Sequence, residues 1–258
     1  MAETTEARKN ADAQNKTRAA GATKRKSPSG TRKKAAGPAK KTADTVALPS
    51  GPVAERVAKL RELSQTDSEG AREEAWNWIR ELGERARSDR EGALDDLQAM
   101  FLCGRPAEGI EGQTEGILVT WTMHPLADKL VGGVTNAWMP WLGKKFDLEQ
   151  RTGLNTLTTS ARWPAKLLWP LYSTTEAPLG RSAFDFNTYV EAGRLDPSVD
   201  VLVIDYESVK TNPGLLIRQI RDELVQIVPG ANLGKMLVNV PGRREPFPAL
   251  YFALKSNY

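Results

Sequence analysis

The chain from Pro52 to Leu102 carries apolar residues at helical spacing. This pattern predicts three amphipathic helices: from Pro52 to the break at Ser64–Ser68, from Glu69 to Arg87, and from Ala93 to Leu102. Proline suits the first turn of a helix, and Gly104-Arg105-Pro106 ends the third one. Such helices must pack on another part of the chain to be stable. The apolar stripes consist of Val53, Val57 and Leu60, then Ala75, Trp78, Ile79, Leu82 and Ala86, and finally Leu94, Leu97, Met100 and Phe101.

Beyond Pro106 the pattern changes to short apolar runs, each bounded by Pro, Gly or Asn, which is typical of β-strands. The alternation is clearest from Ala183 to Glu191, where Phe184 and Phe186 share one face of the predicted strand. Pro229–Asn232 is a turn-type cluster between two such runs and favours a hairpin. The other runs are Ile117–Trp121, Leu157–Ser160, Leu167–Tyr172, Val201–Tyr206, Leu224–Val228, Leu233–Val238 and Leu250–Leu254.

Only two stretches after Pro106 read as helical, about Pro125–Ala137 and Pro213–Arg221. Many short strands with few helices favour an antiparallel sheet that closes on itself, because closure removes exposed strand edges. We therefore predict a mainly β fold. A small antiparallel β-barrel spans residues 106–258, and an amphipathic helical neck spans residues 49–105.

Charge separates the first part of the chain from the rest. Residues 1–45 contain 12 Lys+Arg and 4 Asp+Glu, a net charge of +8, whereas the whole chain carries +4. Residues 1–48 have almost no large apolar side chain before Val46, which predicts a disordered basic tail. Such a tail attracts the phosphates of nucleic acid non-specifically, and it attracts an acidic membrane surface by the same charge. The alternative is a solubilising tail without a partner.

The composition also excludes several classes of site. Cys103 is the single cysteine and His124 the single histidine, so the chain has no internal disulfide and no two-histidine metal site. No apolar run approaches the roughly 18–20 residues of a membrane span, and the N-terminus has no apolar core of a secretory signal. We expect a cytoplasmic protein without a metal or another cofactor.

Six segments in one order carry a resemblance over roughly residues 108–258. They are His124–Asp128, Trp141–Phe146, Ile204–Tyr206, Ile217-Arg218, Leu233–Met236 and Tyr251–Leu254. In order and approximate spacing they resemble the bacterial GXWXG-type family of uncharacterised proteins, whose motif module precedes a domain of unknown function. The chain departs from the family in having Thr114 in place of the motif tryptophan, and its Asp128 is displaced by one position. The resemblance implies a barrel similar to lipocalin-like and fatty-acid-binding-like proteins, with a pocket for an apolar or amphipathic ligand.

Aromatic residues gather around the single histidine. Trp121, Trp138 and Trp141 lie close to His124 in sequence, and such rings line ligand pockets or fill a barrel core. His124 caps the connection from strand to helix, contacts a ligand headgroup, or acts as a general base with Asp128 or Asp205. These alternatives remain open.

Basic residues next to apolar runs are candidate anchors for an acidic headgroup. Lys144 and Lys145 point to opposite faces of a strand, so only one of them faces the barrel interior. A lysine buried there needs a partner, which makes it a candidate anchor for a carboxylate or a phosphate. Arg162 and Arg218 have the same two alternatives, interior anchor or surface, and Asp205 ends a strand as a turn former or an ion-pair partner.

We therefore predict a non-enzymatic protein that binds a lipid or fatty acid in the barrel. The alternatives are a nucleic-acid-associated interaction protein with a filled barrel, and an enzyme that uses His124. The predicted ligand-binding residues are Trp121, His124, Trp138, Trp141, Lys144, Arg162, Phe184, Phe186, Asp205 and Arg218.

Overall fold

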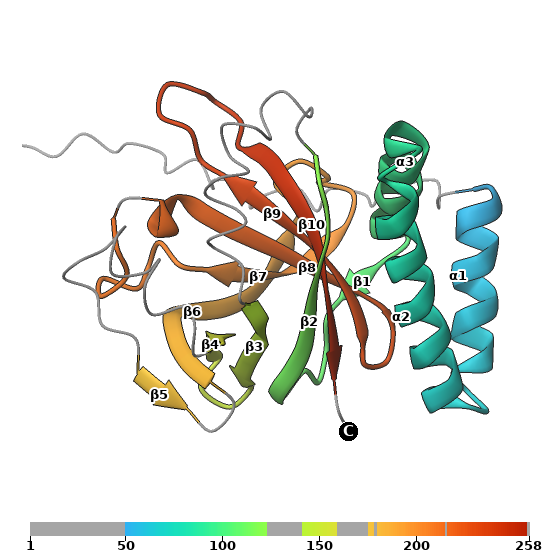
Figure 1. Cartoon of the computed structure of the whole chain (residues 1–258), viewed down its shortest axis with the longest axis horizontal. Coiled ribbons are helices and arrows are strands. Elements are labelled where there is room, and N and C mark those ends of the chain that lie inside the picture. The colour runs from blue at the N-terminus through green and yellow to red at the C-terminus, as the bar shows by residue number, and fades with distance from the viewer. Residues whose placement is uncertain (1–49, 123–140, 159–174, 178–179, 215, 257–258) are drawn as a thin grey trace, which may run out of the picture. The chain divides into compact units, whose positions relative to one another are not determined.

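Three helices lie against one side of a β-barrel in the computed structural model, which describes residues 50–122, 141–158, 175–177, 180–214 and 216–256 (Figure 1). The helices are α1 (Pro52–Leu63), α2 (Ser68–Arg85) and α3 (Arg90–Leu102). The side chain of Asp67 accepts a hydrogen bond from the Gly70 amide and caps α2, and Asp89 does the same for α3 through Gly92. This second cap explains why α3 begins at Arg90, before the predicted Ala93.

Eight antiparallel strands close the barrel among the described residues. Their order around it is β8, β7, β6, β4, β3, β2, β10 and β9, and β9 pairs again with β8. The mainly β fold and the closed antiparallel barrel are therefore confirmed. The strands are β2 (Gly112–Trp121), β3 (Trp141–Asp147), β4 (Thr152–Leu157), β6 (Gly180–Ala192), β7 (Asp200–Asp205), β8 (Ile220–Val228), β9 (Ala231–Val238) and β10 (Phe247–Ser256). Two short strands add to the sheet, β1 (Arg105–Pro106) on β8 and β5 (Thr175–Ala177) on β6.

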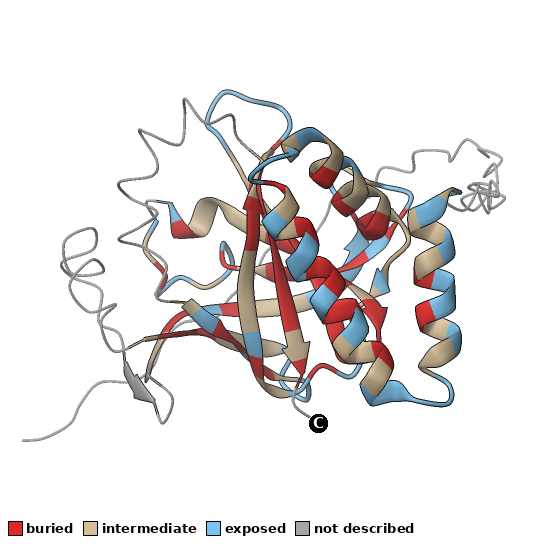
Figure 2. Cartoon of the chain, turned by 45° about the vertical axis from the view of Figure 1, so that its right-hand side comes forward, coloured by how far each residue is buried: buried red, intermediate tan, exposed pale blue. Residues whose placement is uncertain are grey.

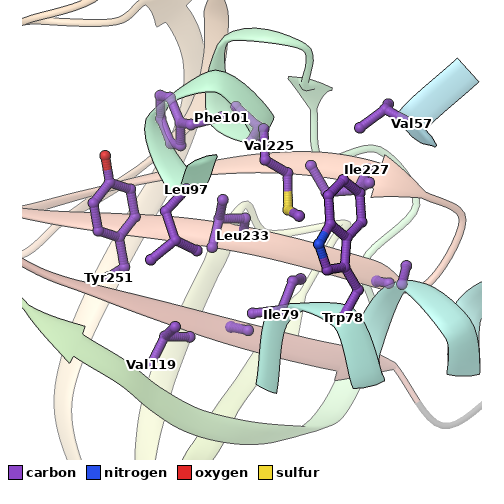
Figure 3. Packing of buried hydrophobic residues seen from close by; sticks show 14 of the residues in the cluster. Val57, Trp78, Ile79, Leu97, Phe101, Val119, Val225, Ile227, Leu233 and Tyr251 are labelled. Carbon is purple, nitrogen blue, oxygen red and sulfur yellow. The ribbon is translucent and has the colours of Figure 1, made fainter. Parts of the chain in front are cut away.

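One hydrophobic core lies between the helices and the outer face of the barrel. Ile79 of α2 and Leu97 of α3 are completely buried there against Val225 and Leu233 of the sheet (Figure 3). Figure 2 shows the buried positions on the sides of α2 and α3 that face the strands, with exposed positions on the opposite sides. The apolar stripes predicted from the sequence provide these contacts.

A second core fills part of the barrel interior. It contains Phe146, Phe186, Leu224, Phe252 and Leu254, which alternate along their strands with residues of the outer core. Strands β8, β9 and β10 therefore bury apolar residues on both faces, because the helices cover their outer side. Double burial explains why β10 is a nearly continuous apolar run, whereas β8 and β9 also bury polar side chains such as Asp222 and Lys235.

Two predicted elements differ from the structure. The predicted helix Pro213–Arg221 is only a 3₁₀ turn at Ile217–Gln219, because Ile220 already pairs with Val238 as the start of β8. Of the run predicted at Leu157–Ser160, only Leu157 belongs to a described strand, as the last residue of β4, which starts at Thr152; residues 159–160 lie outside the described residues.

Three predicted segments lie outside the described residues: the tail 1–48, the helix Pro125–Ala137 and the run Leu167–Tyr172. None of the described helices is both long and apolar enough to cross a membrane.

Candidate functional site

A buried cluster of polar side chains lies inside the barrel. The Lys144 ammonium lies 2.9 Å from Oδ2 of Asp222, and it donates to Oδ1 of Asn155 at 2.8 Å and to the hydroxyl of Tyr206 at 2.5 Å. The Tyr206 hydroxyl in turn donates to Oδ2 of Asp222 at 3.1 Å. Three of these side chains come from strands β3, β4 and β8, and Tyr206 directly follows β7, so four side chains meet at one point among apolar walls. We call them the interior polar cluster.

A local irregularity in β3 directs Lys144 into the barrel. Gly143 has φ of +141°, and the pairing of β3 with β4 shifts register between Trp141 and Gly143. The two interior side chains Trp141 and Lys144 are consequently three positions apart, which a regular strand does not allow. A Cβ at Gly143 would lie 2.1 Å from the carbonyl oxygen of Thr114, so only glycine fits this position.

Thr114 joins β2 to β3 beside this irregularity. Its hydroxyl donates to the carbonyl oxygen of Lys144 at 2.8 Å and accepts from the Lys144 amide at 3.2 Å. Thr114 is buried, and these two bonds hold the backbone of Lys144 in place.

Four aromatic rings surround the Lys144 ammonium. Nζ lies between 5.3 and 5.5 Å from the ring centroids of Trp141, Phe186, Tyr206 and Phe252. At these distances the faces of the rings attract a cation. The Phe252 ring lies over Gly234 of β9, where an added Cβ would come within 2.1 Å of the ring. The cluster thus lies in an aromatic cage within the barrel.

Burial changes the acid–base properties of the cluster. Burial lowers the pKa of Lys144, and the neighbouring Asp222 carboxylate opposes that change. Burial and the same carboxylate raise the pKa of Tyr206 well above its usual value. Because the ammonium has three acceptors within 2.9 Å, we describe Lys144 and Asp222 as an ion pair beside a neutral phenol.

One oxygen of the cluster is left over. Asn155 uses its whole amide, since Oδ1 accepts from Lys144 and from the Trp141 indole, and Nδ2 donates to the Phe184 carbonyl and to Tyr206. In contrast, Oδ1 of Asp222 has no hydrogen-bond partner among the residues that the structure describes. A buried carboxylate oxygen without a donor is costly.

The cluster is almost completely buried, while apolar side chains next to it are less so. The side chains of Lys144 and Asp222 retain 4% and 5% of their accessible area, and Oδ1 of Asp222 has almost none. Met236, which pairs with Asp222 across β8 and β9, is only partly buried, and so is Ile220, two positions before Asp222. Other interior residues that are only partly buried are Leu118, Trp121 and Trp141.

The structure brings five of the predicted site residues into the barrel core. They are Trp121, Trp141, Lys144, Phe184 and Phe186. Phe184 has φ of +57°, and the β4–β6 pairing shifts register beside it, so Ala183 joins Phe184 in the interior core, although strict alternation predicts opposite faces. The predicted site residues His124, Trp138 and Arg162 lie outside the described residues.

Two predicted site residues lie away from the cluster. Asp205 follows Val203 of the outer core by two positions, and its Oδ1 accepts from the amides of Glu207 and Ser208. It is therefore a turn former. Arg218 donates to the carbonyl oxygen of Glu207 in the same turn region. Neither residue belongs to the interior polar cluster, because both side chains bind the backbone of this connection.

Asn155, Tyr206 and Asp222 were missed as site residues in the sequence. Tyr206 shares a face with Leu202 and Ile204, so strand alternation alone is a signal that it points inward. Asp222 directly follows a stretch predicted as helix, and Asn155 lies in a strand segment that apolar patterning did not reveal.

A second buried lysine lies on the outer face of the barrel. Lys235 donates to Oδ2 of Asp196 at 2.6 Å and to Oε1 of Gln98 at 2.8 Å, and the Tyr251 hydroxyl donates to the same Gln98 oxygen at 2.7 Å. A cleft of about 280 Å³ opens beside it, lined also by Leu94 and other residues of α3 and β10. Its buried polar groups bond one another, so we place the candidate site inside the barrel.

The described residues contain no group of three or more His, Cys, Asp or Glu side chains arranged to hold a metal ion. The interior polar cluster has a single carboxylate, which is paired with an ammonium.

Comparisons with known proteins found a solved structure that aligns with this chain, but no family that matches it. No family model matches the chain, and no curated protein matches it. The resemblance to the GXWXG-type family therefore stays a prediction. A crystal structure of a protein from Thermomonospora curvata aligns with a TM-score of 0.36 and 16% identity, over 69% of this chain and 99% of that chain.

Proposed function

We propose that the barrel interior binds a small amphipathic molecule of lipid-like character. The observation that carries this proposal is the interior polar cluster, in which Oδ1 of Asp222 is buried and without a donor among the described residues. The polar end of the ligand bonds this cluster. The apolar body lies along the partly buried interior residues, which include Met236, Ile220 and Trp121.

A purely structural role explains the cluster less well. Replacing a whole buried ion pair by apolar residues is often neutral or stabilising, so the presence of the Lys144–Asp222 pair is not explained by stability alone. A cluster kept for folding alone should also satisfy each of its buried polar atoms. The unpartnered oxygen and the aromatic cage are both expected of a site that a ligand completes.

Native mass spectrometry of the full chain tests the proposal. We expect a small apolar molecule to co-purify at one copy per chain and to be recovered by solvent extraction. The same measurement on Lys144→Met should show loss of this species, because the substitution removes the centre of the cluster. Lys145→Met is the matched control, since Lys145 is the exposed neighbour of Lys144.

The proposal fails under a defined outcome. If the purified chain carries nothing and neither medium-chain alcohols nor fatty acids nor phospholipids bind to it, the barrel has no ligand of this class. Binding that is equal in the wild type and in Lys144→Met would place the ligand elsewhere.

A further inference from the structure

We infer that the polar end of the bound molecule is a neutral hydrogen-bond donor, such as a hydroxyl group, received by Oδ1 of Asp222, and that it is not a carboxylate. This inference rests on the proposed function and specifies the ligand class of the same site. It differs from the fatty-acid binding predicted from the sequence, in which a buried lysine anchors an acid.

The donors and acceptors of the cluster decide which group is missing. Lys144 has three ammonium protons and three acceptors within 2.9 Å, so it has no proton left for a ligand. The Tyr206 proton is used by Asp222, and both amide protons of Asn155 are used by Phe184 and Tyr206. The unpartnered atom of the cluster, Oδ1 of Asp222, is an acceptor. Only a ligand group that donates a hydrogen bond can therefore pair with it.

The net charge of the cluster also excludes a carboxylate as the polar end of the ligand. The cluster contains one ammonium and one carboxylate and is neutral as a pair. A ligand carboxylate at Oδ1 of Asp222 would place two like charges in contact in a buried site, and the ammonium is already used. A ligand ammonium would bring a second cation next to Lys144. A neutral hydroxyl supplies the donor without adding charge.

The walls around Oδ1 of Asp222 define the remainder of the ligand. Met236 pairs with Asp222 on the neighbouring strand and Ile220 precedes it by two positions, and both are apolar and only partly buried. Trp121 pairs with Leu250, which also pairs with Met236, so the apolar wall continues around the barrel from β8 to β2. The ligand class is therefore an apolar alcohol.

Four probes with a straight chain of ten carbons test this inference on the full chain: 1-decanol, decanoate, methyl decanoate, whose ester group carries one further carbon, and decylamine. They share the apolar body and differ in the polar head. The head of decanol is a neutral donor, that of decanoate an anion, that of methyl decanoate an acceptor only, and that of decylamine a cation. Quenching of tryptophan fluorescence and native mass spectrometry both report binding. We expect decanol to bind at least about tenfold more tightly than methyl decanoate, because a hydrogen bond to a charged acceptor is a strong one. Decanoate should bind more weakly still.

Asp222→Asn gives the sharper test, because it should abolish the preference for decanol over methyl decanoate. The amide oxygen of the new side chain takes over the bonds from Lys144 and Tyr206, so the free position carries an N–H₂ donor in place of an acceptor. We expect the variant to bind decanol and methyl decanoate about equally, because the oxygens of both molecules can accept a hydrogen bond. Asp205→Asn is the matched control, since it makes the same chemical change on the outer face.

The outcomes separate the two proposals. If none of the four probes binds, the proposed function itself fails. If decanoate or methyl decanoate binds the wild type more tightly than decanol, ligand binding stands and the inferred donor is wrong. Should Asp222→Asn not fold, the wild-type probe series still decides the matter.

Discussion

Lys144 and Lys235 are buried to the same extent, with 3% of their surface exposed, on opposite faces of the barrel wall. Each ammonium bonds a carboxylate and an amide oxygen, and each lies near aromatic rings. The carboxylates differ, since the Asp222 side chain is 5% exposed and the Asp196 side chain 11%. The two pairs therefore differ in how easily water replaces a lost partner.

Lys144→Met should destabilise the protein strongly. It leaves the Asp222 carboxylate buried without its counter-charge, and breaking a buried pair in this way costs about 3–5 kcal/mol. The free energy of unfolding, measured in urea, checks the expectation. The double variant Lys144→Met/Asp222→Leu should recover most of the loss, because it removes the orphaned charge. Equal stability of Lys144→Met and the exposed control Lys145→Met would contradict the burial argument.

Lys235→Met should cost less than Lys144→Met. Asp196 lies in the connection between β6 and β7, and its carboxylate keeps a bond from the Gln98 amide at 2.7 Å. We expect a loss of about 1–3 kcal/mol, the usual range for leaving a polar group short of a partner. Side-by-side urea curves of the two variants decide the order, and a larger loss for Lys235→Met would refute it.

Stability should fall with rising pH above about 10, the ordinary pKa of tyrosine. The pKa of Tyr206 is raised in the folded state, so the folded protein keeps a proton that the unfolded chain releases above that pH. The stability gained from the neutral phenol is present below pH 10 and is lost as pH rises toward the folded pKa.

Tyr206→Phe should make this alkaline fall shallower, by up to about 1.4 kcal/mol per pH unit. Urea unfolding of both proteins between pH 8 and 11 measures the slopes. In both proteins the raised pKa of Tyr251 contributes in the same direction, whereas the lowered pKa of Lys144 contributes in the opposite direction. The difference between the two slopes therefore reports Tyr206, and parallel slopes would exclude it.

Gly234→Ala should lower stability by about 1–3 kcal/mol through overpacking. The added methyl group would meet the Phe252 ring at 2.1 Å, and that ring is 4% exposed inside the barrel. Gly214→Ala is the control, because a Cβ there has no heavy atom within 4 Å. Thermal unfolding of both variants distinguishes the close approach from a general effect of removing glycine.

Most of the fold could be predicted from the sequence, because helical spacing and strand alternation of apolar residues are local signals. The stripe containing Ile79 and Leu82 predicted which side of α2 is buried, and the alternation around Val203 predicted the two faces of β7. These signals need only the 3.6-residue and two-residue repeats of helix and strand. They were sufficient to predict a closed antiparallel barrel.

The interior polar cluster was harder to predict, because two strand irregularities shift the alternation between inward-facing and outward-facing residues. At Gly143 and at Phe184 the strands bulge, so that Trp141 and Lys144, and likewise Ala183 and Phe184, share the interior. No local pattern shows that Lys144 meets Asp222, which is far away in sequence and follows a stretch that reads as helical. Such a pairing is decided by the register of the closed sheet.

Strand β10 closes the barrel between β2 and β9, and this position affects how the chain folds during synthesis. Trp121 pairs with Leu250, and the Gln98 side chain accepts a hydrogen bond from Tyr251, 153 residues further along the chain. While a ribosome is still making β10, the sheet has two open edges and the helices have no complete wall to cover. The emerging chain consequently depends on late, long-range contacts, and until they form its open edges are available to other nascent chains.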